Sequence, residues 1–580
     1  MRWTDYALLT ILMVFLCGAD AISGRPLTLH EARLPQTSRE MMRSGNWLIP
    51  TSGGRPWLER PPLPHWIMIT TAYATDTQCD TEWSVRIAPG LMALIVVLLT
   101  AWMADVLFDR NIALASGLIL ATMFEFYRYA TLAEDDIFLA AVVVGAMALF
   151  VRMEFLFDPQ ALGRRTSIFG WRPWPVVAFF ILLGLTNMAK GPIVGAAVVL
   201  GTTGVFLLIQ KQWLRIKRYL WLWGILAAAV IGFSWHIWIQ RRFPEYWSNL
   251  RYDFSDTEEF NNPWWYYPPN LLFLTLPWSP AAIIALFLTW RGAWREKQPN
   301  LRFLWCWAIV PIIVLSLAHR KHHHYLVPSL APWAILAALG VKPIAQHMFQ
   351  GPAKTRKISF GLMIFGAPGA ITLAVLAVLH IIPGPFAMTA ALIAIWLLCV
   401  IMFYRGLWIH DARWLMAAMI LGFSVLYSWG QRYWPNADVQ DTQFTREAEA
   451  DVPRDKLLAV DGDVGPLDFF RLQFYLRPDA MLLQNLTYLR SNQIHSPDIY
   501  IISRAKFAAD LSQYGTSEQI LQSTYTRRET SPADRFTLFH LIFSPDLSRY
   551  DPPPVSPMQA MMRESGPFCG PAPVKTRASE

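Results

Sequence analysis

The chain has 580 residues, of which 54% are hydrophobic and only 16% are charged, and its formal net charge is +8. This composition excludes an ordinary soluble protein, and the length excludes a simple membrane anchor. Apolar runs long enough to cross about 30 Å of hydrocarbon recur along the chain. Because these runs are continuous rather than alternating, they predict membrane-spanning helices and not a transmembrane β-barrel. The positive charge suits cytoplasmic loops, so we expect no nucleic-acid partner.

Thirteen membrane-spanning helices are predicted in the first three quarters of the chain. The first apolar run also resembles a signal peptide, but we interpret it as an uncleaved span that starts in the cytoplasm. With this orientation, basic residues such as Lys211, Arg215 and Lys354 fall in cytoplasmic connections, as the positive-inside rule requires. The predicted spans are residues 5–22, 87–108, 111–130, 136–153, 173–190, 192–210, 219–239, 270–290, 302–318, 326–342, 358–380, 385–404 and 413–431.

An odd number of spans places the C-terminal region on the extracytoplasmic side, where the composition becomes that of a soluble domain. Short apolar runs alternate there with helix-like stretches, which predicts a small α/β domain over residues 432–551. The tail, residues 552–580, is rich in Pro, Ser and Gly and is predicted to be disordered. The runs that carry this prediction are Lys456–Val460, Ile499–Ser503 and Phe536–Leu541, with the helix-like stretch Pro466–Tyr475.

The predicted fold class is therefore an all-α polytopic membrane protein with a small soluble α/β domain at its C-terminal end. The transmembrane domain covers residues 1–431 and includes a long first extracytoplasmic loop, residues 23–86. The bacterial inner membrane is the expected location, with the N-terminus in the cytoplasm and the C-terminal domain in the periplasm. We expect a monomer.

The first loop concentrates charged residues that have both structural and chemical interpretations. Glu31 is a candidate base, but with Thr28 it also fits a capping box at a helix start. His30 is either a surface histidine or a catalyst, and Arg33 is either a solvated residue or an anion ligand. Later in the loop, the charged pair Glu59–Arg60 precedes a stiff proline-rich stretch.

Three further segments place charge at the predicted extracytoplasmic ends of spans. The acids of Glu134-Asp135-Asp136 repel one another, so they need a cationic partner or a raised pKa, unless they are a solvated helix start. Lys190 in the Lys190-Gly191-Pro192 break is either functional or snorkels to the interface. The run from His319 to Tyr325, which includes Lys321, favours a bound anion over zinc because consecutive imidazoles cannot share one ion on a helix.

Together these segments supply carboxylates and cations at the level of lipid headgroups. A carboxylate can take the proton of an attacking hydroxyl, and fixed Lys and Arg side chains stabilise a departing phosphate. This combination suits the transfer of a group from a lipid-linked phosphate. A transporter or flippase of polyprenyl-linked glycans would use the same cations, and an inactive scaffold that binds lipid-linked sugar is the third alternative.

The motifs resemble those of GT-C superfamily glycosyltransferases that use polyprenyl-phosphate donors, over roughly residues 5 to 340. Within that superfamily the chain is similar to bacterial lipid A aminoarabinose transferases and protein O-mannosyltransferases. The matching motifs, in chain order, are His30-Glu31-Ala32-Arg33, Arg39-Glu40-Met41, Gly45-Asn46-Trp47, Glu59-Arg60-Pro61-Pro62-Leu63-Pro64, Ala133-Glu134-Asp135-Asp136, Lys190-Gly191-Pro192, Pro263-Trp264-Trp265-Tyr266-Tyr267, Pro277-Trp278-Ser279 and Lys321 through Tyr325 to Pro328.

The resemblance implies a glycosyltransferase that moves a sugar from a polyprenyl-phosphate donor to a hydroxyl of lipid A, another glycan or lipid, or a protein on the periplasmic face. It implies that Glu31 or His30 acts as the base, with Asp136 orienting the acceptor or sharing that role. The residues that it implies for the donor phosphate are Arg33, Arg60, Lys190, Lys321 and Tyr325.

Two departures from the family pattern bear on the chemistry. His30 stands where the family carries an aspartate, and Arg60 stands where it carries a lysine. Glu59 is a candidate metal ligand by resemblance to the aminoarabinose branch, but the loop 244–262 lacks the partner histidine and carries acids such as Asp253 and Asp256 instead. The sequence therefore establishes no cofactor, and a divalent metal remains an alternative.

Overall fold

The computed structural model describes residues 1–53, 55–156, 169–211, 213–248, 250, 262–318, 321–350, 386–433, 437–477, 479–483, 485–524 and 531–550. The chain divides into two compact units. The first, which we call the helical unit, comprises Met1–Ser23, Pro89–Ser234 and Phe260–Trp434. The second, which we call the mixed unit, comprises Gly24–Ala88, Trp235–Glu259 and Pro435–Glu580. The predicted disordered tail, 552–580, lies outside the described residues.

Six helices in the described part of the chain are long and apolar enough to cross a membrane. A seventh candidate span is a bent pair, α14 (Tyr267–Leu274) and α15 (Ser279–Trp290), whose axes meet at 120°. The six long helices are α1 (Trp3–Ile22), α4 (Glu82–Leu107), α7 (Asp135–Val151) with its π-helical extension η1 (Arg152–Leu156), α12 (Leu222–Arg242), α16 (Pro299–Ser316), and α17 (Leu330–Gln350) with the 3₁₀ turn η3 (His323–Ser329) before it.

Shorter helices complete this pattern. The predicted spans fall on helices, except 358–380, which lies outside the described residues. Two of them, 111–130 and 270–290, are each broken into two helices. The chain is thus a multi-pass membrane protein. The remaining helices are α5 (Arg110–Ala121), α6 (Phe124–Ala130), α9 (Trp174–Lys190), α10 (Val194–Ile209), α11 (Trp213–Tyr219), η2 (Arg291–Arg295), α20 (Phe386–Ile409) and α21 (Ala412–Tyr433).

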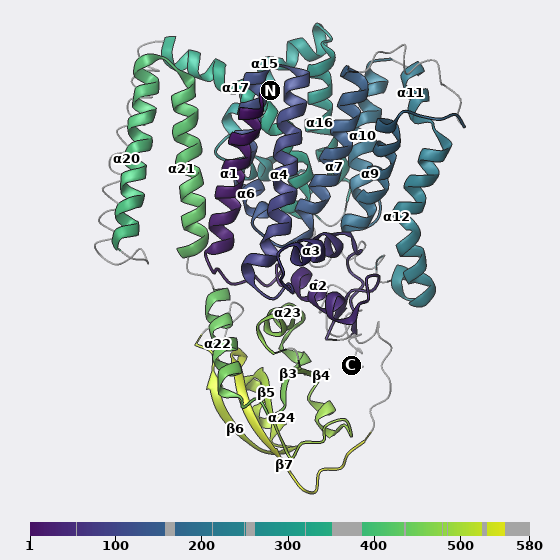
Figure 1. Cartoon of the computed structure of the whole chain (residues 1–580), viewed down its shortest axis with the longest axis vertical. Helices are drawn as coiled ribbons and strands as arrows, with labels where there is room; N and C mark the ends of the chain where they lie inside the picture. The colour runs from purple at the N-terminus through teal and green to yellow at the C-terminus, as the bar shows by residue number, and fades with distance from the viewer. Residues whose placement is uncertain are drawn as a thin grey trace, which may run out of the picture. The chain divides into compact units, whose positions relative to one another are not determined.

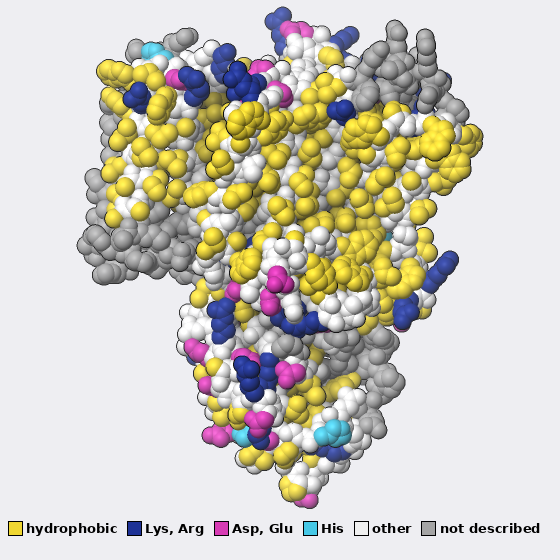
Figure 2. Space-filling view, viewed as in Figure 1, with side chains coloured by type: hydrophobic (Ala, Val, Ile, Leu, Met, Phe, Trp, Pro, Cys, Tyr) yellow, Lys and Arg dark blue, Asp and Glu magenta, His cyan; other side chains and the backbone are white. Residues whose placement is uncertain are grey.

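The helices run side by side, with α7 against α9, α10 against α16, and α15 against α17 (Figure 1). Small residues allow the closest approaches, because lipid does not drive helices together and packing must do so. At Gly340 of α17, a Cβ would lie only 2.1 Å from the carbonyl oxygen of Ala281. The face of the helical unit seen in Figure 2 is largely apolar between its ends. Large apolar side chains are exposed, such as Phe287, which is 74% exposed. Such exposure suits hydrocarbon rather than water.

The mixed unit combines the first loop with the C-terminal domain. Its sheet has the strand order β4-β3-β5-β7-β6, with β4, β3 and β5 parallel and β7 antiparallel to both of its neighbours. The loop supplies α2 (Arg33–Ser44), β1 (Thr51–Ser52), β2 (Arg55–Pro56) and α3 (Leu63–Ala74). The C-terminal part supplies α22 (Ala437–Asp451), β3 (Leu458–Asp461), η4 (Gly462–Val464), α23 (Pro466–Tyr475), β4 (Met481–Leu483), η5 (Leu486–Arg490), β5 (Asp498–Arg504), η6 (Ala505–Phe507), α24 (Ala508–Leu511), β6 (Gly515–Gln522), η7 (Pro532–Asp534) and β7 (Phe536–Phe543).

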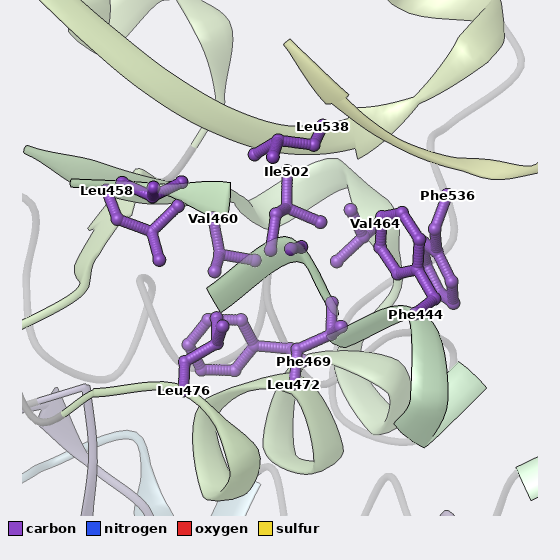
Figure 3. Packing of buried hydrophobic residues seen from close by; sticks show 12 residues of the cluster. Phe444, Leu458, Val460, Val464, Phe469, Leu472, Leu476, Ile502, Phe536 and Leu538 are labelled. Atoms are coloured by element: carbon purple, nitrogen blue, oxygen red, sulfur yellow. The ribbon is translucent and has the colours of Figure 1, made fainter. Parts of the chain in front are cut away.

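Both faces of this sheet are buried, because successive residues of a strand point to opposite sides. On β7, Phe536 and Leu538 join a core with α22 and α23, while Phe539 and Leu541 join the core on the other face. Figure 3 shows Leu538 and Ile502 of the first core above Phe469 and Leu472 of α23. The predicted apolar runs therefore became strands, and the helix-like stretch became α23 with the predicted bounds.

Hydrogen bonds join α2 of the first loop to α23 of the C-terminal domain. Arg39 donates from its guanidinium to the carbonyl oxygens of Phe474 at 3.0 Å and Gln473 at 2.7 Å. Its Cζ also lies 5.2 Å from the centroid of the Phe474 ring. The backbone amide of Leu27 donates to the Tyr475 hydroxyl at 2.9 Å. These contacts explain why two segments more than 400 positions apart form one unit.

Leu538→Ala tests the sheet core. Removing this fully buried side chain from between α23 and the sheet should lower the free energy of unfolding of the mixed unit by about 2–5 kcal/mol. Thermal unfolding of the purified protein, read by protease susceptibility of the C-terminal domain, measures the loss. Ile520→Ala on β6 is the matched control, because Ile520 is 40% exposed. Equal losses for the two variants would contradict the core assignment.

Candidate active site

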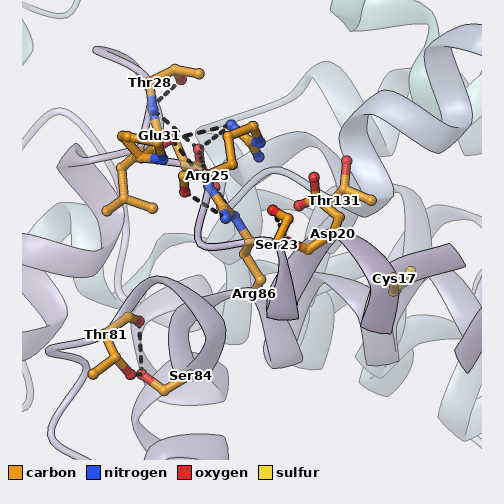
Figure 4. Close-up of polar contacts among 12 residues, drawn as sticks. Cys17, Asp20, Ser23, Arg25, Thr28, Glu31, Thr81, Ser84, Arg86 and Thr131 are labelled. Carbon is orange, nitrogen blue, oxygen red and sulfur yellow. Dashed lines mark hydrogen bonds and ion pairs between the residues drawn. The ribbon is translucent and has the colours of Figure 1, made fainter. Parts of the chain in front are cut away.

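Glu31 lies fully buried at the start of the first loop, where it completes the predicted capping box. The Thr28 amide donates to Glu31 Oε2 at 3.1 Å, and the Glu31 amide donates to Thr28 Oγ1 at 3.2 Å. Two arginines also converge on the carboxylate (Figure 4): Arg86 Nε lies 2.8 Å from Oε1, and Arg25 Nη1 lies 3.3 Å from Oε2. Both carboxylate oxygens are therefore engaged.

This environment makes Glu31 a weak base. Burial alone would raise its pKa, but the charges of Arg86 and Arg25 and the hydrogen bonds to the carboxylate together lower the pKa from 4.5 to about 2. A carboxylate with such a low pKa has little affinity for a proton, so it is a poor general base. The geometry thus favours the structural interpretation of Glu31 over the catalytic one. Sequence reasoning missed Arg86, although its position just before a predicted apolar span was a signal.

The other first-loop candidates form a separate cluster around Glu59. Arg33 Nη1 lies 3.2 Å from Glu59 Oε1, and Arg60 Nη2 lies 2.9 Å from the same oxygen. Burial opposes ionisation of Glu59, but the neighbouring Arg60 and Arg33 charges hold its pKa below the usual range. The side chains of all three residues are 14–21% exposed, so a ligand can reach them more easily than it can reach Glu31.

His30 belongs to the same cluster, and its partner determines its tautomer. Its Nδ1 lies 3.2 Å from Nη2 of Arg33. A guanidinium can only donate, so Nδ1 must accept and the ring proton of the neutral imidazole sits on Nε2. In this arrangement neither nitrogen of His30 is poised to take a proton from a substrate hydroxyl.

Within the helical unit, Asp136 and Lys190 form an ion pair at two helix ends. Asp136 is in the first turn of α7 and is 3% exposed, while Lys190 is the last residue of α9. The positive end of one helix dipole and the negative end of the other favour these charges. The acidic segment thus has the cationic partner that its repulsion required, and Lys190 does not simply snorkel.

Tyr325 completes this arrangement from η3. The ammonium nitrogen of Lys190 lies 4.8 Å from the centroid of the Tyr325 ring, within cation–π range. The chain leaves α9 at Gly191 with a φ of 128°, a conformation that favours glycine. Beyond it, the Ile193 amide donates to Oδ1 of Asn187 at 3.0 Å, which stabilises the break.

Lys321 lies just before η3 and is tied to Asn262. Its ammonium donates to the carbonyl oxygen of Asn262 at 3.2 Å, and the Asn262 amide group donates to the carbonyl oxygen of Lys321 at 2.9 Å. Lys321 is 6% exposed, so these contacts hold a buried cation near the start of the turn that carries Tyr325. Sequence reasoning missed Asn262, for which no motif gave a signal.

A third group is the histidine run itself. His323 Nδ1 lies 2.5 Å from Oε1 of Glu125, which is fully buried in α6. His322 stacks on His324, whose ring lies 5.8 Å from that of Tyr129. The three imidazoles therefore face different partners and not one ion. His319 and Arg320, at the start of the run, lie outside the described residues.

The described residues offer no metal centre. They contain no group of three or more His, Cys, Asp or Glu side chains that could hold an ion. Glu59, the predicted candidate, is already paired with two guanidinium groups, so it does not fit a metal ligand. Asp253 and Asp256, which stand near the position of the missing histidine, lie outside the described residues.

The structure therefore gathers the predicted site residues into groups within each unit. In the helical unit, Asp136, Lys190 and Tyr325 are in direct contact, and Lys321 lies next to the same turn. In the mixed unit, His30, Arg33, Glu59 and Arg60 form one cluster, and Glu31 belongs to another. Glu125 was missed, although an acid inside a predicted span is itself a signal of function.

Membrane-spanning helices with charged ends, together with a mixed unit, define a polytopic membrane protein. Its fold is similar to that of ArnT from Cupriavidus metallidurans. In the apo state that structure matches with a TM-score of 0.70 at 19% identity, covering 93% of this chain and 98% of ArnT. Bound to undecaprenyl phosphate, it matches with a TM-score of 0.69 at 19% identity, over 95% of this chain and all of ArnT.

The sequence comparisons find similarity to glycosyltransferases. The model of the dolichyl-phosphate-mannose-protein mannosyltransferase family matches residues 36–249. Undecaprenyl phosphate-alpha-4-amino-4-deoxy-L-arabinose arabinosyl transferase 2 of Proteus mirabilis (strain HI4320) is 29% identical over 53% of this chain and 54% of its own length. The corresponding transferase of Aeromonas salmonicida (strain A449) is 28% identical over 66% of this chain and 67% of its own. The alignment thus spans about half of the Proteus protein.

The pH dependence of stability tests the assignment of Glu31 as a structural residue. Its lowered pKa means that the ionised form stabilises the folded mixed unit above pH 4.5, by about 3 kcal/mol at roughly 1.4 kcal/mol per pKa unit. This contribution should be lost as the pH falls from 4.5 toward 2. Thermal unfolding between pH 7 and pH 3 should therefore show lower stability for Glu31→Gln at neutral pH and a smaller loss on acidification.

Glu518→Gln serves as the control for this experiment, because Glu518 is an exposed residue of β6. The stability of this variant should fall with pH in the same way as that of the unchanged protein. Identical acid profiles for Glu31→Gln and the unchanged protein would refute the assignment.

Proposed function

We propose that this protein is an integral-membrane glycosyltransferase that moves a sugar from a polyprenyl-phosphate donor to a hydroxyl acceptor. The observation that carries the proposal is the position of Lys190, a cation held between the Asp136 carboxylate and the Tyr325 ring at the end of a membrane helix. Such a cation, with Lys321 beside the same turn, suits a phosphate at the level of lipid headgroups. The names of the relatives support an undecaprenyl-phosphate donor.

Charge supplies the physical reason for catalysis. The donor is a phosphodiester with one negative charge, and the departing polyprenyl phosphate gains a second charge as its bond to the sugar breaks. Lys190 and Lys321 would therefore bind the transition state more tightly than the donor, which is the condition for lowering a barrier. Asp136 has a positioning role in this scheme, because its ion pair orients Lys190 at the end of α9.

The Tyr325 hydroxyl would add a hydrogen bond to the phosphate. In the mixed unit, the cluster of Arg33 and Arg60 provides two further guanidinium groups, whose planar forks suit phosphate oxygens. Glu59 limits this cluster to a small net positive charge, since it neutralises one of the two cations. We propose that both arginines contribute to binding of the donor anion.

The proposed acceptor is a hydroxyl group of lipid A, of another glycan or lipid, or of a protein on the periplasmic face of the bacterial inner membrane. In this orientation the N-terminus is cytoplasmic, and the C-terminal domain is periplasmic. The positive-inside distribution of Lys and Arg supports it. We propose that the protein acts as a monomer.

Release of polyprenyl phosphate from a labelled undecaprenyl-phosphate sugar tests the reaction. We expect purified protein to release it in the presence of acceptor lipids. Lys190→Ala should lower kcat by about 10²–10³-fold, because the cation acts mainly in the transition state. Lys342→Ala, at an exposed lysine of α17, is the matched control and should keep its activity.

A transporter or flippase would move labelled lipid between vesicle leaflets without releasing polyprenyl phosphate. An inactive scaffold would bind donor and do neither. Either result for the unchanged protein, assayed with aminoarabinose, mannose and other sugar donors, would overturn the proposed reaction.

Arg60→Ala tests the role of the mixed unit. Loss of this guanidinium should weaken donor binding by about tenfold, because a charge-assisted hydrogen bond contributes roughly 1.5–3 kcal/mol. The melting temperature should change little, because Arg33 still pairs with the Glu59 carboxylate after the substitution. Donor affinity is measured by titration with a fluorescent undecaprenyl-phosphate analogue, and Arg549→Ala in the C-terminal domain is the control. An unchanged affinity would exclude Arg60 from the donor site.

A further inference from the structure

Glu125 is a charged residue that the proposed function has not yet used. It lies in α6 between Phe124 and Phe126, within a predicted membrane span, and none of its surface is exposed. A carboxylate in such a place costs free energy unless a partner stabilises it, and acids inside membrane spans mark functional groups. Its partner is His323, whose Nδ1 lies 2.5 Å from Glu125 Oε1.

This partner determines which nitrogen of His323 carries the proton. An ionised carboxylate can only accept, so in the neutral imidazole the proton sits on Nδ1 and Nε2 keeps its lone pair. The arrangement is the reverse of that at His30, where the donor Arg33 places the proton on Nε2. The His323 side chain is 35% exposed while the carboxylate is fully buried, so the imidazole is the group that a substrate can approach.

His323 also lies among the residues proposed to bind the donor phosphate. It is the first residue of η3, two positions after Lys321 and two before Tyr325. The ring of His324 bridges the turn, at 5.4 Å from the His323 ring and 4.9 Å from the Tyr325 ring. Tyr325 in turn contacts Lys190. The segment from Lys321 to Tyr325 thus carries one cation, the imidazole of His323, and the ring that contacts the second cation, Lys190.

We propose that His323 is the base that takes the proton of the acceptor hydroxyl, and that Glu125 positions it. The inference rests on the proposed function. The other carboxylates are less suited to the role, because Glu31 is held by two arginines and Asp136 by Lys190. A carboxylate–histidine pair in which the imidazole keeps a free lone pair is the usual form of such a base.

The step balances without a cofactor. The acceptor oxygen forms a bond to the anomeric carbon of the sugar, and its proton moves to Nε2 of His323. The bond between the anomeric carbon and the phosphate oxygen breaks, and its electron pair leaves with the polyprenyl phosphate. The charge of Glu125 stabilises the imidazolium, which then releases its proton to water.

The first test replaces the imidazole. His323→Ala should lower kcat by about 10²–10⁴-fold, the contribution of a general base, with little change in the KM for donor. Added imidazole should restore part of the rate, and substituted imidazoles should restore it in the order of their basicity. His347→Ala is the matched control, because His347 is an exposed histidine of α17 outside the proposed site and its loss should leave the activity unchanged. If His323→Ala does not accumulate in membranes, His323→Gln serves as the second variant.

The second test asks whether Glu125 acts through His323. Glu125→Gln should lower kcat by about tenfold or more with donor KM unchanged, yet it should have no further effect in the His323→Ala background. If Glu125 had only a structural role, Glu125→Gln would instead lower kcat by the same factor in the unchanged protein and in the His323→Ala background. Additive losses, with no restoration by imidazole, would overturn the inference.

The outcome for the unchanged protein separates this inference from the proposed function. If the unchanged protein releases polyprenyl phosphate and His323→Ala keeps its kcat within about threefold, far less than a base contributes, the inference is wrong and the proposed function stands. If the unchanged protein releases none from any donor, the proposed function is wrong, and the inference falls with it.

Discussion

Pairing of buried charges is the constraint on which the chemistry of this protein depends. A charge in the dry interior of a membrane protein persists only when an opposite charge or several donors compensate for the lost water. In the helical unit the Asp136–Lys190 pair meets this requirement with the help of two helix dipoles. In the mixed unit Glu31 meets it with two arginines and a capping box. Each functional group is therefore defined by its partner as much as by its own type.

The pairs differ in what remains accessible. Glu31 and its arginines are buried almost completely. Their mutual attraction therefore stabilises the loop, and a ligand cannot reach them. Lys190 keeps 13% of its side chain exposed and rests on an aromatic ring, which is a weaker hold than a second carboxylate. In the proposed donor site a phosphate would compete for Lys190, whereas the buried Arg86 is closed to a ligand. Exposure is thus the property by which we separate the proposed binding cation from the structural one.

Much of the fold follows from the sequence, because its signals are local. Continuous apolar runs gave the positions of the helices, and the run of α23 was placed with its observed bounds. The joining of the first loop to the C-terminal domain was not predictable, since the contact of Arg39 with Phe474 links segments 435 positions apart. The motifs likewise identified Asp136, Lys190 and Tyr325, but they could not reveal that Glu31 is closed off by Arg86, which stands 55 positions away.

The two histidines show most clearly why residue type alone does not define a role. His30 occupies the motif position that suggested catalysis, yet Arg33 can only donate to it and leaves it without an available lone pair on Nδ1. His323 stands in a run that suggested an anion or a metal, yet its Nδ1 contacts the buried carboxylate of Glu125, and on this contact rests the role of base that we propose for it. The same side chain thus has opposite chemical properties in one protein. Arg33 stands in the same motif as His30, three positions away, whereas Glu125 lies 198 positions from His323 within an apolar span, so only the fold reveals the second partner.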